Sequence, residues 1–158
     1  MGSHCLPVMQ PDDWLLLCRT VRFGETDAAG VMHFHQLLRW CHEAYEESLE
    51  RFGIPPAQIF PGSSPRTGAP VLPIVHCSAD YLRPLRVGDP LTITLRPVLV
   101  DPGCFEVHYA FSKTGEAVAR GRTRHRAITA DERKPCSLPD PIARWLEASG
   151  LAQGVRPL

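Results

Sequence analysis

This sequence lacks three features that would each indicate a broad class of protein. Its 17 basic and 17 acidic side chains balance, so no whole-molecule field favours nucleic acid or an anionic membrane. No apolar run approaches the roughly 20 residues that a membrane-spanning helix needs. No charged-then-apolar secretory signal opens the chain. We therefore expect a cytoplasmic protein that binds neither nucleic acid nor membrane.

Motifs for common metal, nucleotide and hydrolase sites are also missing. The six cysteines are scattered without a C-x-x-C pair, so we expect most of them to be small buried residues. The sequence has no G-x-G-x-x-G, no P-loop and no G-x-S-x-G. The run His-Glu-Ala-Tyr-Glu at 42–46 ends in glutamate, where a zinc-protease helix needs a second histidine. We expect no metal and no cofactor.

The chain of 158 residues is long enough for one domain with a sizeable core. Residues 1–13 are expected to form a tail, and its opening Met-Gly-Ser-His resembles an expression-tag scar. We place the domain at residues 14–139, followed by a short helix and tail at residues 140–158.

The most regular pattern covers residues 34–52. Apolar residues recur there at three- and four-residue steps with charged residues between them, which predicts one long amphipathic helix. Gly53 provides a stop, and the Pro-Pro pair at 55–56 prevents the helix from resuming. Residues 54–70 are rich in proline and glycine, which favours a loop.

Apolar stretches bounded by turn sequences predict β-strands in the rest of the domain. The strands are expected at residues 14–23, 71–82, 91–100, 105–111 and 117–129, with turns at 83–90, 101–103 and 113–116, and a short helix at 141–148. One strand, a long helix and a four-stranded meander indicate an α+β domain with an antiparallel sheet. One helix cannot cover both faces of such a sheet, so self-association is expected.

Residues 21–31 place a lone carboxylate, Asp27, in a turn of small residues between the first strand and the long helix. Gly24 and Gly30 allow the backbone there to come close to a ligand. Two interpretations are open from the residues alone. Asp27 is a catalytic acid, or it accepts hydrogen bonds within an ordinary turn.

The motif Arg-Phe-Gly-Glu-Thr-Asp-Ala-Ala-Gly-Val at 22–31, with this order of elements, resembles the hotdog fold and its 4-hydroxybenzoyl-CoA thioesterase-like family. Cys-His-Glu-Ala-Tyr-Glu at 41–46 and Leu-Pro-x-Val-His at 72–76 extend the likeness to cyanobacterial 1,4-dihydroxy-2-naphthoyl-CoA thioesterases. The resemblance implies a five-stranded antiparallel sheet wrapped around one long central helix. It also implies hydrolysis of that thioester to the acid and CoA, in phylloquinone or menaquinone biosynthesis.

The resemblance assigns roles to individual residues. Asp27 is implied to be the catalytic carboxylate, as nucleophile or as general base. The Phe34 N–H is implied to polarise the thioester carbonyl at the helix start, where free N–H groups favour an oxyanion. The implied substrate-binding residues are Gly30, Val31, His33, Leu72, Pro73 and Ile74. The candidates for holding the CoA phosphates are Arg83, Arg86, Arg122 and Arg124, each of which fits a solvated strand end or turn equally well.

Further alternatives follow from the same likeness. Relatives of another branch place their carboxylate on the long helix, which makes Glu43 and Glu46 the reserve candidates. The expected assembly is a homodimer with the site at its interface, joined into a homotetramer, with the partner's residues 71–75 lining the acyl pocket. Two rival functions share the fold: a broad-specificity or 4-hydroxybenzoyl-type thioesterase, and a non-catalytic protein that binds acyl-CoA.

Overall fold

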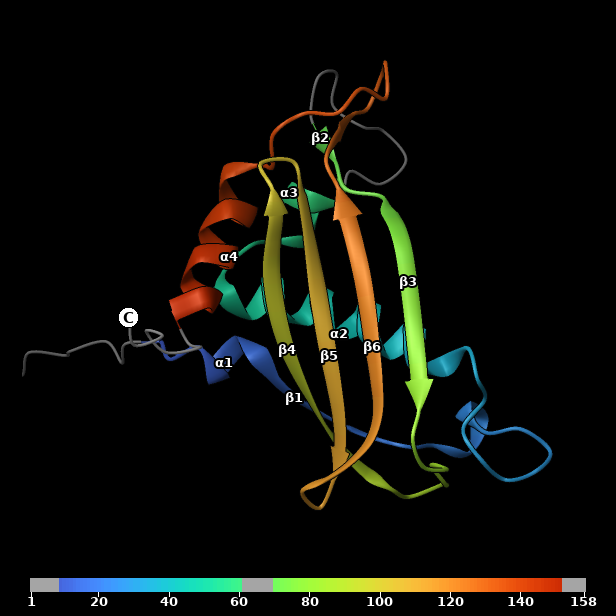
Figure 1. Cartoon of the computed structure of the whole chain (residues 1–158). Coiled ribbons are helices and arrows are strands. Elements are labelled where there is room, and N and C mark those ends of the chain that lie inside the picture. Colours follow the sequence, from blue (N-terminus) through green and yellow to red (C-terminus); the bar gives the residue numbers. More distant parts are fainter. Residues whose placement is uncertain (1–8, 61–69, 152–158) are drawn as a thin grey trace, which may run out of the picture.

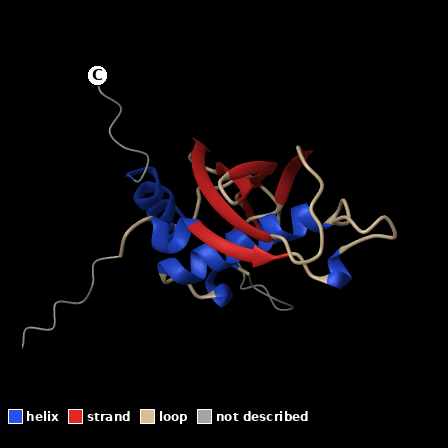
Figure 2. Cartoon of the chain, turned by 90° about the horizontal axis from the view of Figure 1, so that it is seen from below, coloured by secondary structure: helices blue, strands red, loops and turns tan. Residues whose placement is uncertain are grey.

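The computed structural model describes residues 9–60 and 70–151. A five-stranded antiparallel sheet wraps around one long helix, α2 (Gln36–Phe52), which confirms the α+β class and the arrangement expected from the resemblance (Figure 1). Seen from below, α2 lies against the concave side of the curved sheet (Figure 2). None of the helices in these two described segments is long and apolar enough to cross a bilayer.

The sheet has the strand order β1-β4-β5-β6-β3, and a separate two-stranded sheet pairs β2 with β7. The strands are β1 (Leu16–Thr20), β2 (Pro70–Val71), β3 (Ile74–Tyr81), β4 (Pro90–Asp101), β5 (Cys104–Lys113), β6 (Glu116–Arg126) and β7 (Ile128–Thr129). The remaining helices are α1 (Asp12–Leu15), the 3-10 helix η1 (Phe23–Glu25), α3 (Pro56–Ile59) and α4 (Asp140–Leu151).

The meander expected from the sequence was wrong in one respect. Only β4, β5 and β6 follow one another as neighbours, and β3 pairs with β6 at the far edge of the sheet. The single strand expected at 71–82 is split into β2 and β3, because Pro73 has no N–H to donate to a ladder. The two edge strands, β1 and β3, therefore both precede the meander in sequence but flank it on opposite sides in the sheet.

The first predicted strand was also too long. Residues 12–15 form α1, because Pro11 and the acidic pair Asp12 and Asp13 suit a helix start. Residues 23–25 form η1, so Asp27 follows a helical turn and not a strand directly. In the segment expected to be a loop, Pro56 begins the short helix α3, and residues 61–69 lie outside the described residues.

The long helix begins at Gln36, two residues later than expected. His35 takes the N-cap position, and the Gln36 N–H donates to the His33 carbonyl at 3.0 Å. The predicted stop at Gly53 is confirmed, since this glycine has a φ of 104° and its N–H bonds to carbonyls of the last turn. Phe34 thus lies in the turn that leads into the helix.

The core lies between α2 and the sheet. Large side chains from both sides are fully buried there, among them Trp40, Tyr45, Phe105 and Tyr109. Helix α4 closes one end of this core: Trp145 is fully buried and its indole N–H donates to Ser48 of α2 at 3.1 Å. In Figure 1, no helix or strand of residues 9–60 and 70–151 covers the opposite, convex face of the sheet.

Candidate active site

Asp27 lies in a tight turn over residues 27–31. The Asp27 N–H donates to the Val31 carbonyl at 2.9 Å, and one carboxylate oxygen, Oδ1, accepts the Ala29 N–H at 2.8 Å. Gly30 has a φ of 79°, a conformation that favours glycine. The turn therefore fixes the exposed Asp27 carboxylate through one oxygen, and the other accepts no hydrogen bond from the described residues.

This turn is attached to the loop between β3 and β4. Val31 forms a β-bridge with Arg86, and the Met32 N–H donates to the Leu85 carbonyl at 2.7 Å. The loop itself is braced by Asp89, which accepts from the Arg86 N–H and from Lys113. The hydrogen bond from Lys113 is the main reason why the pKa of Asp89 is lowered. The Asp27 turn is thus joined by backbone contacts to the loop between β3 and β4.

Phe34 follows the Asp27 turn. Its ring is 70% exposed, and its N–H donates no hydrogen bond to any described residue. The neighbouring His33 N–H is used, since it donates to the Glu25 carbonyl at 2.8 Å. The side chains of His33 and His35 approach one another on either side of Phe34, with 2.6 Å between their Nδ1 atoms. A free N–H beside the start of a helix is suited to binding an oxyanion.

Tyr81 is a residue of this region that the sequence analysis missed. It ends β3, and its hydroxyl donates a hydrogen bond to the Phe34 carbonyl. Tyr81 also borders a cavity of about 250 Å³ with Val31, Met32, Arg83 and Leu85. An aromatic residue that closes a strand directly before a turn was the only signal in the sequence.

The predicted substrate-binding residues fall into two groups. Gly30, Val31 and His33 lie in or beside the Asp27 turn, and Val31 lines the cavity. Leu72, Pro73 and Ile74 lie at the opposite end of β3, seven residues before Tyr81. At roughly 3.3 Å per residue, about 23 Å separates the two ends of this strand. One chain therefore does not bring both groups together.

Comparisons with known proteins show the family of the chain. A model of the thioesterase-like superfamily matches residues 21–146. The chain belongs to the thioesterase-like superfamily. A protein of Prochlorococcus marinus (strain MIT 9303) called 1,4-dihydroxy-2-naphthoyl-CoA hydrolase is 55% identical over 147 residues, which cover 92% of this chain and 97% of the relative. A protein with the same name from Synechococcus sp. (strain RCC307) is 60% identical over 129 residues, covering 82% and 98%.

A solved structure extends the likeness to three dimensions. The 1,4-dihydroxy-2-naphthoyl-CoA thioesterase of Synechocystis is 33% identical, with a TM-score of 0.76 over 84% of this chain and 94% of its own. The hotdog fold and the family inferred from residues 22–31 are therefore confirmed.

Among the CoA-binding candidates of this thioesterase-superfamily chain, Arg83 borders the cavity and forms an ion pair with Glu116 at 2.7 Å. Arg86 lies in the adjoining loop. Arg122 and Arg124 alternate on β6 with the buried Thr123, so they lie on the convex face of the sheet. Each has a guanidinium nitrogen 3.5 Å from Glu106. Of the four, Arg83 lines the same cavity as Val31, and Arg86 forms the backbone bridge with Val31.

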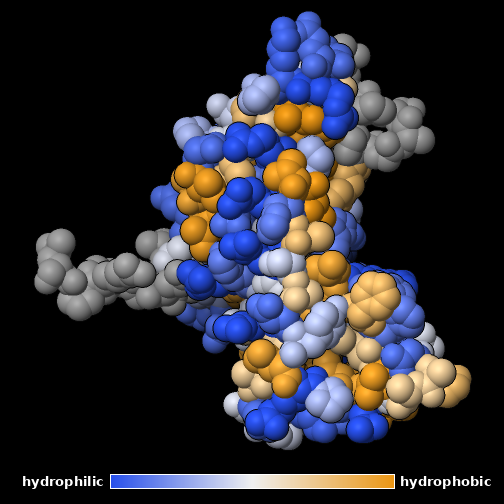
Figure 3. Space-filling view, turned by 45° about the vertical axis from the view of Figure 1, so that its right-hand side comes forward, coloured by the Kyte–Doolittle hydropathy of each residue, from blue (hydrophilic) through white to orange (hydrophobic). Residues whose placement is uncertain are grey.

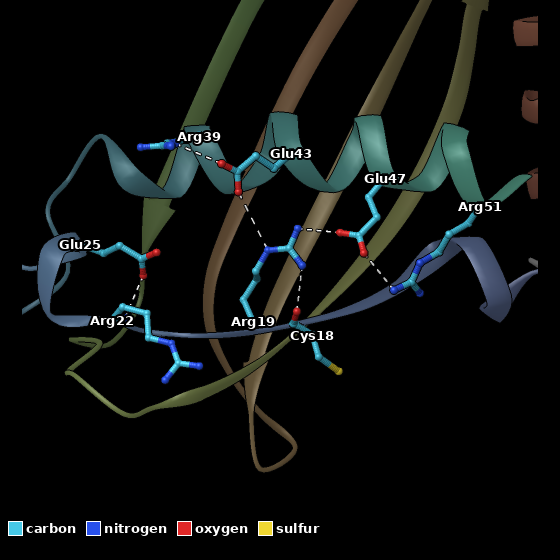
Figure 4. A network of polar contacts seen from close by, with 8 residues as sticks. All are labelled: Cys18, Arg19, Arg22, Glu25, Arg39, Glu43, Glu47 and Arg51. Atoms are coloured by element: carbon cyan, nitrogen blue, oxygen red, sulfur yellow. Dashed lines mark hydrogen bonds and ion pairs between the residues drawn. The ribbon is translucent and has the colours of Figure 1, made fainter. Parts of the chain in front are cut away.

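The reserve carboxylates of α2 both contact nitrogen atoms of neighbouring side chains. Glu43 accepts from Arg39 at 3.1 Å and lies 4.0 Å from Arg19, and Glu46 pairs with His42 at 2.6 Å. In Figure 4, Glu43 and Glu47 both point from α2 towards Arg19 of β1. These contacts give Glu43 a structural role in joining the helix to the first strand.

Three buried polar side chains, Tyr109, Thr123 and His125, form a chain of contacts in the core. The Tyr109 hydroxyl lies 3.0 Å from Thr123 Oγ1, which lies 2.8 Å from His125 Nε2. The His125 ring stacks on Phe105 at a centroid distance of 4.7 Å. Burial lowers the pKa of His125 to about 3 and raises the pKa of Tyr109 well above its usual value. Both groups are therefore neutral in the folded protein near pH 7.

The thiols are less uniformly buried than expected. Cys41 and Cys104 are buried as predicted, whereas Cys18 on β1 and Cys77 on β3 are exposed. Within residues 9–60 and 70–151, no three His, Cys, Asp or Glu side chains are placed to hold a metal ion.

Proposed function

We propose that this chain is an acyl-CoA thioesterase that hydrolyses 1,4-dihydroxy-2-naphthoyl-CoA to 1,4-dihydroxy-2-naphthoate and CoA. The observation that carries the proposal is the 55% identity, over 97% of its length, to a protein named for that reaction. The exposed Asp27 carboxylate and the free Phe34 N–H supply the chemistry that the reaction requires. As part of this proposal, the product is used in phylloquinone or menaquinone synthesis and the enzyme acts in the cytoplasm.

The reaction uses two groups of this chain. The thioester carbonyl binds with its oxygen towards the Phe34 N–H, which stabilises the negative charge that develops on it. Asp27 attacks the carbonyl carbon to form a mixed anhydride that water then cleaves, or it takes a proton from a water that attacks directly. In either route the carbon–sulfur bond breaks, and CoA leaves as a thiolate that takes up a proton.

The cavity beside Val31 is too small for the whole substrate. Its volume of about 250 Å³ lies below the ~300–1,000 Å³ typical of small-molecule sites. The remaining walls must therefore come from elsewhere, and Leu72, Pro73 and Ile74 of the same chain lie at the far end of β3. A second copy of the chain supplies them.

Strand β3 is suited to such pairing because it is exposed along nearly its whole length at the edge of the sheet. Ile74, Val75 and Tyr81 are 41%, 54% and 48% exposed, and hydrophobic residues are visible on this side of the molecule (Figure 3). In an antiparallel two-fold pair centred on Ser78, the register shift between Ile74 and His76 places the partner's Ile74 opposite Tyr81. The dimer then completes the acyl pocket beside each Asp27, and two dimers associate into a tetramer.

The position of Arg83 at the rim of the cavity makes it the preferred contact for the CoA phosphates. Its partner Glu116 is exposed, so this ion pair exchanges readily for a phosphate. Arg86, Arg122 and Arg124 remain candidates for contacts farther along the nucleotide.

The test is an assay of CoA release by the purified chain and by Asp27→Asn, with naphthoyl, benzoyl and aliphatic thioesters. We expect a preference for the naphthoyl thioester and a loss of about 10²–10⁴-fold in kcat for the variant. Asp131→Asn is the matched control, because Asp131 also accepts a nearby backbone N–H from an exposed turn. Equal rates on all thioesters would indicate the broad-specificity alternative, binding without turnover would indicate the non-catalytic one, and full activity of Asp27→Asn would exclude the mechanism.

A further inference from the structure

The backbone of Phe34 is held by an unusual combination of contacts. Its N–H is free among the described residues, while its carbonyl accepts the hydroxyl of Tyr81 from the distant strand β3. The residue before it is fixed on both sides, since the His33 N–H donates to Glu25 and the His33 carbonyl accepts from Gln36. Tyr81 is thus the contact that fixes Phe34 itself.

The precision of this contact matters for the proposed reaction. A donor stabilises an oxyanion when it lies about 2.7–3.1 Å from it, and a displacement of about 1 Å can cost ~100-fold in rate. Phe34 precedes the first residue of α2, so the helix ladder does not set its orientation. Burial raises the pKa of Tyr81, so its hydroxyl keeps the proton that it donates.

Resting on the proposed function, we infer that Tyr81 is a positioning residue: its hydroxyl holds the Phe34 peptide so that the free N–H points at the thioester oxygen. Tyr81 sits where β3 ends, beside the cavity and opposite the place of the partner's Ile74. The strand that pairs the two copies therefore also sets the orientation of the oxyanion donor.

A simpler role for Tyr81 makes a different prediction. Its ring borders the cavity, so it could serve only as a wall for the acyl group. Loss of a wall contact weakens binding of substrate and transition state alike and raises KM, whereas loss of positioning lowers kcat. Removal of the hydroxyl alone separates the two roles, because the ring stays in place.

The experiment compares Tyr81→Phe with the wild-type chain on naphthoyl-CoA. We expect kcat to fall by about 10–100-fold while KM and the melting temperature stay close to the wild-type values. Tyr109→Phe is the matched control, since it removes a hydroxyl that bonds Thr123 in the core, and it should lower the melting temperature with kcat unchanged. Unchanged kcat in Tyr81→Phe, or a rise in KM alone, would overturn the inference.

A second measurement is independent of turnover. The His35 amide nitrogen shares its peptide bond with the Phe34 carbonyl, so its ¹⁵N chemical shift responds to the hydrogen bond from Tyr81. The ¹⁵N chemical shift of His35 should change in Tyr81→Phe and stay the same in Tyr109→Phe. An unchanged His35 shift in Tyr81→Phe would contradict the hydrogen bond between Tyr81 and Phe34. A wild-type chain that hydrolyses no thioester would instead refute the proposed function, which the Asp27→Asn assay registers separately.

Discussion

The two edges of the sheet are built in opposite ways. At the β1 edge, Arg19 reaches to Glu47 at 2.6 Å and to Glu43 at 4.0 Å, and Arg51 returns to Glu47 and to the Leu16 carbonyl. This network ties the strand to α2 (Figure 4). At the β3 edge, by contrast, every residue from 74 to 81 except Ala79 is exposed.

This difference indicates which edge strand is protected by contacts within its own chain and which is left open to another strand. An exposed strand edge offers unpaired N–H and C=O groups to another strand, and proteins usually protect such edges. The β1 edge is protected by charged side chains and by the helix, whereas the β3 edge carries apolar residues at both ends. The comparison therefore supports β3 as the edge used in the proposed self-association, and β1 as an edge closed by contacts within the chain.

The largest effect should follow from a charge placed on the β3 edge. Cys77 is exposed near the middle of β3 and pairs with Thr123. We expect Cys77→Arg to separate the dimer, because the two guanidinium groups would lie on one face close to the two-fold axis and repel each other. The variant should reduce kcat/KM by about 100-fold through loss of the partner's pocket wall. Light scattering during size exclusion gives the mass, and CoA release gives the rate.

The matched control is Cys18→Arg, which places the same charge on the exposed thiol position of β1. It should leave mass and rate unchanged. The wild-type chain offers an independent check, since alkylation followed by peptide mass spectrometry should modify Cys18 faster than Cys77. Equal alkylation of the two thiols, or a Cys77→Arg dimer, would rule out β3 as the interface.

An intermediate effect is expected from lowering the pH. Contributions to the free energy of unfolding should be lost first on the β3 side of the sheet and then, at lower pH, on the β1 side. His125 lies on β6 opposite Ile74, and its folded-state pKa of about 3 is below the ordinary value of 6.5. Between these values the unfolded chain binds the proton and the folded chain does not, so the free energy of unfolding falls as pH is lowered. The loss from this group is about 1.4 kcal/mol per pH unit below pH 6.5.

Glu47 on the β1 side responds later. Partial burial alone would raise the pKa of Glu47, but hydrogen bonds and the charges of Arg19 and Arg51 lower it below its ordinary value of 4.5. Its contribution is present above that value and is lost at more acid pH. Urea unfolding measured between pH 7 and 4.5 should therefore show that the free energy of unfolding falls as the pH is lowered. His125→Phe should reduce this pH dependence, and Glu47→Gln should leave it unchanged. A wild-type stability independent of pH in this range would contradict the assignment.

The smallest effect concerns the β1 network. We expect Arg19→Ala to lower the free energy of unfolding by about 1 kcal/mol, because the half-buried guanidinium joins two glutamates of α2 to the strand. This corresponds to a fall of about 2–4 °C in melting temperature. The mass of the assembly should stay the same, and differential scanning calorimetry measures the shift.

The comparison variant for stability is Glu116→Gln, which breaks the exposed ion pair with Arg83 at the β3 side. Pairs that both face solvent contribute little, so its melting temperature should change by less than that of Arg19→Ala. A larger shift in Glu116→Gln would mean that the β1 network is not the stronger support.

Local patterns in the sequence predicted much of the fold. The heptad-like spacing in α2, its end at Gly53 and the turns at 101–103 and 113–116 are all found in the structure, because each depends on neighbouring residues. The partner of β3 could not be predicted from spacing, since pairing with β6 or with β4 satisfies the same alternation. The helical turn at Asp12–Leu15 was missed because its apolar residues also suit a strand.

In the site, too, the features that depend on neighbouring residues could be predicted, and those that depend on distant contacts could not. The turn around Asp27 was evident from its residues, and the resemblance singled out Phe34. The role of Tyr81 depends on a contact across 47 residues of sequence, which no local pattern encodes. The predicted Leu72–Ile74 group stands apart from Asp27 in one chain, because residues close in function need not belong to the same copy.

The eight-residue length of β3 has a consequence for how the chain can vary. In the proposed dimer the length of β3 sets the distance between its two ends. One end must lie at the pocket of its own copy, and the other must reach the pocket of the partner, where it forms the wall. Two added residues would keep every side chain on its face, yet they would move the wall by about 7 Å along the strand. Length in this strand is therefore constrained more tightly than composition, and insertions should be tolerated in the hairpin ends of the sheet and not here.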